Sequence, residues 1–69
     1  MPIIWTAKRI KKLRFITRNS QATFSGIVGV SRVTISNWES EFKTPSARHQ
    51  ATLDNIAKEY GVTQRQLDR

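Results

Sequence analysis

The segment RVTISNWES, residues 32–40, combines a tryptophan anchor with side chains suited to polar contact. Wound as a helix, it places on one side Thr34, Ile35 and Trp38. The other side then consists of Arg32, Val33, Ser36, Asn37 and Ser40. A guanidinium and an amide are strong hydrogen-bonding groups, and the side chains around them are small. The pattern predicts a short helix fixed to a core by its tryptophan, with a polar contact face toward solvent.

The rest of the chain lacks the residue sets of common catalytic and metal sites. It has no cysteine and one histidine, His49, so thiolate and multi-histidine metal sites are excluded. It also shows no pairing of a nucleophile with a base and no phosphate-binding loop. We therefore expect a protein that is not an enzyme and that needs no metal or cofactor.

The charge of the chain indicates an anionic partner. Twelve lysines and arginines against five acids give a net charge of +7. This charge favours nucleic acid, an acidic protein face or anionic lipid. Half of the basic residues lie close together: Lys8, Arg9, Lys11, Lys12, Arg14 and Arg18. A solvated helix face accounts for such a run as well as a binding surface does.

No apolar run approaches the roughly 20 residues that span a bilayer, and the N-terminal sequence MPIIWTAKRI has too short an apolar stretch for a signal peptide. We expect a cytoplasmic protein with no membrane partner.

The elements that must position the contact face are helices of one domain, residues 1–69, because so short a chain supports a single compact core. Residues 6–18 form an amphipathic helix capped by Thr6, with an apolar side of Ala7, Ile10, Leu13 and Ile16. A second helix begins at Gln21 after a cap at Ser20, and its inward residues are Phe24, Ile27 and Val28.

A short turn leads from the second helix into the third. Gly29 occupies the position where a chain leaving a helix commonly needs positive φ, and Ser31 can cap the next helix. A fourth helix begins near Pro45 and Ser46, with an apolar stripe of Leu53, Ile56, Ala57 and Tyr60. Gly61 ends it, Thr63 caps a last short helix, and Leu67 returns to the core. The sequence predicts an all-α, compact five-helix bundle without strands.

The second and third helices have the spacing of a helix-turn-helix. Counted from Gln21, apolar residues occupy the fourth, eighth, tenth, fifteenth and eighteenth positions: Phe24, Val28, Val30, Ile35 and Trp38. Ser25 supplies the small residue where the helices touch, and Gly29 supplies the turn. This pattern is typical of two short helices that cross steeply.

The segment SQATFSGIVGVSRVTISNWE resembles the Cro/repressor (XRE-type) helix-turn-helix family. The resemblance extends from about Leu13 to Leu67 and includes Pro45 and the closing GVTQRQL. It implies a lambda-repressor-like DNA-binding domain whose helix-turn-helix spans about residues 21–40. Small bacteriophage Cro-like repressors and modulators of repressor are similar in size.

The resemblance also implies which residues touch double-stranded DNA. Members of the family lay the third helix in the major groove, which makes the base-contacting candidates Arg32, Val33, Ser36 and Asn37. Arginine suits guanine, asparagine suits adenine, and valine suits a thymine methyl. The corresponding phosphate-contacting candidates are Gln21, Ser31, Lys43 and Thr44.

Three positions depart from the family pattern. Ser25 replaces the usual alanine, so its hydroxyl must bond to its own helix. Glu41 stands where glycine is usual, which favours a different end for the third helix and puts a carboxylate near the phosphate path. The interval from Pro45 to Ala57 is about one helical turn longer than expected. Glu39 is expected to pair with an arginine such as Arg14.

Two functions remain open at this point. The first is a transcription regulator, most simply a phage or prophage repressor, that binds operator half-sites as a homodimer at the nucleoid of a bacterial host cell. The second is a modulator or antirepressor that binds a heterologous repressor protein, with or without DNA, through its basic surface. For this second function the candidate interface residues are Trp5 and Phe42, whereas Trp5 is equally suited to fastening the first helix.

Overall fold

The predicted all-helical architecture is confirmed for residues 3–69, which a computed structural model describes. This part of the chain contains no strand and five helices: α1 Ala7–Ile16, α2 Gln21–Val28, α3 Arg32–Glu39, α4 Ala47–Glu59 and α5 Gln64–Leu67. None of these helices is both long and apolar enough to cross a membrane.

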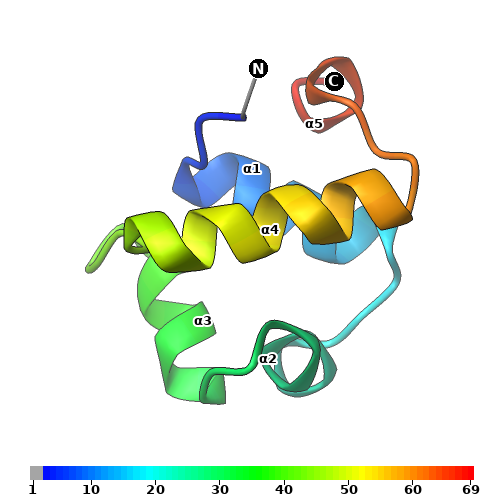
Figure 1. Cartoon of the computed structure of the whole chain (residues 1–69). Helices are drawn as coiled ribbons and strands as arrows, with labels where there is room; N and C mark the ends of the chain where they lie inside the picture. The colour runs from blue at the N-terminus through cyan, green and yellow to red at the C-terminus, as the bar shows by residue number, and fades with distance from the viewer. Residues whose placement is uncertain (1–2) are drawn as a thin grey trace.

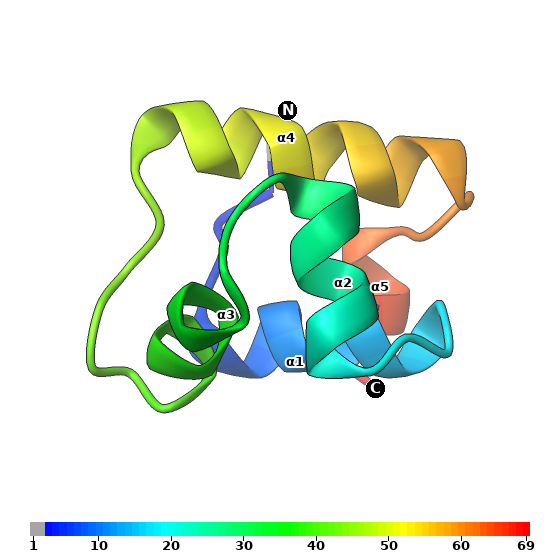
Figure 2. The same ribbon diagram turned by 90° about the horizontal axis from the view of Figure 1, so that it is seen from below.

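Figure 1 shows how the helices are arranged in space. Helices α2 and α3 lie at one end, α5 lies at the other, and α4 runs across the molecule in front of α1. Each of α2 and α3 is seen end-on in the view where the other lies in the plane (Figures 1 and 2), so the two cross steeply.

Every helix contributes to one apolar core. Its buried members are Trp5, Ile10, Leu13, Phe24, Val28, Ile35, Trp38, Leu53, Ile56, Ala57, Val62 and Leu67. Two predicted inward residues are wrong, because Ile27 is 41% exposed and Tyr60 is 50% exposed. Helix α2 packs through Phe24, Ser25 and Val28, which leaves Ile27 at the edge of its buried face. Tyr60 follows the last residue of α4 and lies outside its packed stripe.

The predicted helix starts are confirmed by their caps. The hydroxyl oxygens of Thr6, Ser20 and Ser31 accept hydrogen bonds from backbone N–H groups three residues later, at 3.1–3.2 Å. Thr63 forms a reciprocal capping box with Gln66. Ser46 precedes α4 without such a bond, since its hydroxyl lies 3.1 Å from Nδ1 of His49.

Each of the helices α1 to α4 is followed closely by a residue with positive φ, the left-handed backbone conformation. The sequence predicted this conformation only where the residue is glycine. Gly29 has φ 87° and Gly61 has φ 67°, as expected for turn glycines. Arg18 also has positive φ, 59°, so α1 ends at Ile16 rather than at Arg18. Glu41 has φ 67°, which corrects the expectation of a different ending for α3: the chain takes up the left-handed conformation without glycine.

The N-terminal segment is fastened to α4 through Trp5. This side chain is 5% exposed, and its indole N–H donates to Oδ1 of Asp54 at 2.8 Å. The backbone N–H of Ile3 donates to the same carboxylate oxygen at 3.2 Å. Trp5 as an exposed contact for another protein is therefore wrong, because packing against α4 removes it from the surface.

Candidate functional site

Helix α3 separates an anchoring side from an exposed side, as its spacing predicted. Ile35 is fully buried and Trp38 is 4% exposed. On the opposite side Arg32, Val33 and Ser36 are exposed. Val33 is 64% exposed, so most of its side chain is accessible to a partner. The exposed side of α3 thus offers a guanidinium, a hydroxyl and an apolar methyl surface together.

Asn37 is less accessible than the other three candidates. Its side chain is half-buried, and its backbone carbonyl oxygen accepts a hydrogen bond from the backbone N–H of Lys43 at 3.2 Å. This bond folds the chain back after α3, so Lys43 begins close to the last turn of the helix. The structure therefore brings a base-contacting candidate and a phosphate-contacting candidate together through the backbone.

The turn between α2 and α3 is short and is held by backbone hydrogen bonds to Ser25. The N–H groups of Gly29 and Val30 both donate to the carbonyl oxygen of Ser25, at 2.8 and 3.0 Å. Ser25 is 7% exposed, and its hydroxyl donates to the carbonyl oxygen of Ala22 at 2.6 Å. The expected back-bonding of this hydroxyl is confirmed, and it allows a polar residue to occupy the contact between α2 and α3.

A mostly buried ion pair holds α3 against α1. Arg14 donates from Nε to Oε2 of Glu39 at 2.7 Å and from Nη2 to Oε1 at 3.0 Å. Its Nη1 donates to the carbonyl oxygen of Asn19 at 3.2 Å. The hydrogen bonds to Glu39 raise the pKa of Arg14 above its ordinary value. The predicted pairing of Glu39 with Arg14 is confirmed, and it joins the end of α3 to α1 with two-pronged geometry.

Gln21 extends this pair into a network that also holds α2. Its Nε2 donates to Oε1 of Glu39 at 3.3 Å, and the side chain is half-buried. Sequence reasoning missed this contact, because the eighteen-residue separation of Gln21 and Glu39 gives no local signal. The backbone N–H of Gln21 remains at the start of α2, where the first N–H groups have no partner within the helix.

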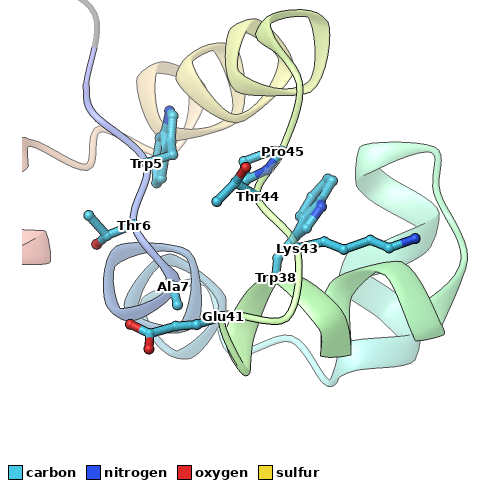
Figure 3. A pocket seen from close by; sticks show the side chains of 8 residues that line it. All are labelled: Trp5, Thr6, Ala7, Trp38, Glu41, Lys43, Thr44 and Pro45. Atoms are coloured by element: carbon cyan, nitrogen blue, oxygen red, sulfur yellow. The ribbon is translucent and has the colours of Figure 1, made fainter.

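The other two hydroxyl-bearing phosphate-contacting candidates are Ser31, which caps a helix, and Thr44, which lines a pocket. Ser31 is exposed, and its hydroxyl caps α3 while also lying 3.0 Å from the hydroxyl of Thr34. Thr44 lines a pocket of about 270 Å³ between the N-terminal segment, the start of α1 and the loop after α3. Figure 3 shows the Thr44 side chain between Trp5 and Trp38, within this pocket.

Lys43 and Glu41 leave the loop in different directions. Figure 3 shows the Lys43 side chain extending away from the pocket, whereas Glu41 points toward Ala7 at the start of α1. A carboxylate is stabilised near a helix N-terminus by the helix dipole. Phe42, between these two residues, is 75% exposed.

Among residues 3–69, no three His, Cys, Asp or Glu side chains gather closely enough to hold a metal ion. Comparison of the chain with protein families, with curated protein sequences and with solved structures finds no significant match.

Proposed function

We propose that this protein is a sequence-specific DNA-binding regulator of transcription in which α2 and α3 form a helix-turn-helix. One observation carries the proposal: α3 buries Ile35 and Trp38 and turns Arg32, Val33 and Ser36 to solvent. The network of Arg14, Glu39 and Gln21 holds this helix rigidly against α1 and α2. Rigid presentation matters, because base recognition depends on fixed hydrogen-bond geometry.

The dimensions of α3 suit the major groove. An α-helix with its side chains is about 10–12 Å across, and the groove is about 12 Å wide, so the eight-residue α3 can lie in it. In this arrangement Arg32 donates to the O6 and N7 of a guanine, Asn37 pairs with an adenine, and Val33 packs on a thymine methyl. Ser36 is small enough to let the helix approach the base edges.

Phosphate contacts at both ends of the motif complete the proposed interface. The N-terminus of α2 at Gln21 and the start of α3 at Ser31 supply N–H groups to one strand. Lys43 follows α3 and contacts the DNA backbone beyond it through its side chain, while Thr44, whose side chain lies in the pocket between Trp5 and Trp38, contributes through its backbone N–H. The direction of Glu41 in Figure 3, toward α1 and away from the Lys43 side chain, supports this assignment by separating the carboxylate from the cation.

One α3 reads only a few base pairs, so we propose that two copies bind half-sites about one DNA turn apart, roughly 34 Å. The net charge of +7 adds a general attraction to DNA that weakens as salt rises.

The test is selection of binding sites from fragmented host DNA, with excess competitor, followed by affinity measurements on the enriched site. Arg32→Ala is expected to cost about 1–3 kcal/mol and to relax preference at one base position, while Lys43→Ala weakens binding to all sequences alike. Lys58→Ala, which removes an exposed charge from the last turn of α4, is the matched control. Unchanged affinity and preference in Arg32→Ala would refute the proposed recognition helix.

The exposed Phe42 supports the second function, binding to another repressor protein. An aromatic side chain that is 75% exposed beside a lysine suits a protein interface. Capture of a repressor that survives nuclease treatment and is lost in Phe42→Ala would favour this function. Capture of DNA alone would exclude it.

A further inference from the structure

The basic run on α1 is not used by the proposed DNA interface. Lys8, Lys11, Lys12 and Phe15 recur at helical spacing and share one face of α1. The opposite face carries Ile10 and Leu13, which are fully buried. Phe15 is 58% exposed, so an aromatic ring stands among three lysines on the outer face of the helix.

These residues surround a shallow pocket of about 200 Å³ that α1 shares with the C-terminal segment. We call this the α1–α5 surface; its lining residues are Lys8, Lys11, Lys12, Phe15, Leu67 and Arg69. For comparison, an apolar cavity of about 150 Å³ holds a benzene molecule. The pocket therefore has room for one leucine-sized or aromatic side chain.

The α1–α5 surface lies away from the exposed side of α3. In Figure 1, α5 occupies the end of the molecule opposite α2 and α3, and in Figure 2, which views α2 and α3 from the front, α5 lies behind them. A partner on this surface does not need the residues proposed to touch DNA.

The positive charge of this surface is not balanced by the ion pairs that residues 3–69 form. Asp68 is held by Arg9, whose Nε and Nη2 donate to its two oxygens at 2.8 and 2.9 Å. The other pair joins Arg14 to Glu39. Neither includes Lys8, Lys11 or Lys12. The hydrogen bonds from Arg9 and, to a smaller extent, the nearby charge of Lys8 lower the pKa of Asp68, so the charges of Lys11 and Lys12 are the ones left for a partner.

We propose that the α1–α5 surface binds an acidic protein segment that inserts one apolar side chain between the lysines. Carboxylates complement the lysines, and the apolar side chain fills the pocket against Phe15. The Arg14 guanidinium stacks over the Phe15 ring at 4.9 Å and is itself fixed by Glu39, so the aromatic wall is held in place before a partner arrives.

Nucleic acid fits this surface less well. A duplex backbone presents phosphates but no apolar group that would enter the pocket. Proteins that bind single-stranded nucleic acid usually offer several aromatic side chains, on which successive bases stack. Here one aromatic residue is present, Arg14 already covers one side of its ring, and the four residues span only about two helical turns.

The experiment measures fluorescence anisotropy with two labelled peptides of about 12 residues, or three helical turns. The first alternates Leu and Phe with pairs of Asp and Glu, and the second has Ser in place of Leu and Phe. We expect the first peptide to bind the wild-type protein at least about tenfold more tightly than the second. Oligothymidylate of the same length is the competitor that represents nucleic acid.

Two variants locate the binding. We expect each of two variants, Phe15→Ser and the double change Lys11→Glu with Lys12→Glu, to lower the affinity for the first peptide by about tenfold or more. The matched control, Arg48→Glu with Lys58→Glu on α4, alters the net charge equally and should retain binding. Thermal unfolding of each variant verifies the fold, and all substituted side chains except half-buried Lys12 are exposed.

Equal binding of both peptides would overturn the proposal, because attraction would then be purely electrostatic. The proposal would also be overturned if the α4 control variant lost as much affinity for the first peptide as the α1 variants do. Displacement of the first peptide by oligothymidylate at lower concentrations than by unlabelled peptide would assign the surface to nucleic acid instead. Operator binding by the Phe15→Ser variant is expected to be unchanged, which keeps this test separate from that of DNA recognition.

Discussion

Replacing Glu39 by alanine tests whether the ion pair between α1 and α3 sets the position of the proposed recognition helix. The side chains of Arg14 and Glu39 are 12% and 6% exposed. The substitution removes two hydrogen bonds from Arg14 and one from Gln21. Arg14 then keeps the carbonyl oxygen of Asn19 as its partner in the network, in surroundings that exclude most water.

The expected cost follows from leaving a mostly buried guanidinium without its carboxylate. Breaking such a pair from one side costs about 3 kcal/mol. A chain of 69 residues has a free energy of unfolding of roughly 3.5–10 kcal/mol, so the loss is about 30% or more of the total. For a domain of this size, the midpoint of thermal unfolding should fall by about 12–24 °C.

Urea unfolding monitored by tryptophan fluorescence measures this cost, because Trp5 and Trp38 are both buried. Asp68→Ala, which breaks the exposed pair with Arg9, is the matched control and should change stability little. The double change Arg14→Met with Glu39→Met should be less destabilising than the sum of the single changes. If Glu39→Ala costs no more than Asp68→Ala, the network does not hold α3 in place.

Three further outcomes follow from single contacts. Trp5→Phe should lower the free energy of unfolding by about 1–2 kcal/mol in urea titrations, because Asp54 loses the indole N–H. Glu41→Gly should raise it by about 1 kcal/mol, since glycine adopts φ 67° without the cost that Glu41 bears; an unchanged urea midpoint would contradict this. The hydrogen bonds from Arg9 lower the pKa of Asp68 below the usual 3.8, so this carboxylate contributes stability above pH 3.8 that is lost as pH falls through the lower pKa of the folded state. The thermal midpoints of wild type and Asp68→Asn should therefore differ most near neutral pH, and the difference should disappear as the pH falls below 3.8.

Much of the candidate site could be predicted from sequence because its signals are local. Caps at Thr6, Ser20 and Ser31 bond to N–H groups three residues away, so the start of each helix is specified within one turn. The same short range determines which side of α3 carries Ile35. Helical spacing therefore predicted the five helices and the exposed residues of α3 before any tertiary contact was known.

The sequence by itself determined where the helices form and which of their faces are apolar. Only the tertiary structure decided which side chains are buried, hydrogen-bonded or ion-paired by distant segments of the chain. Trp5 is buried in the core, where Asp54, 49 residues away, accepts its indole N–H. Gln21 is bound to Glu39 by the crossing of α2 and α3. Lys8 lacks an ion pair among residues 3–69, while its neighbour Arg9 pairs with Asp68 at the far end of the chain. These outcomes depend on which distant segments pack together, and that is set by the shared core rather than by the residues along one turn.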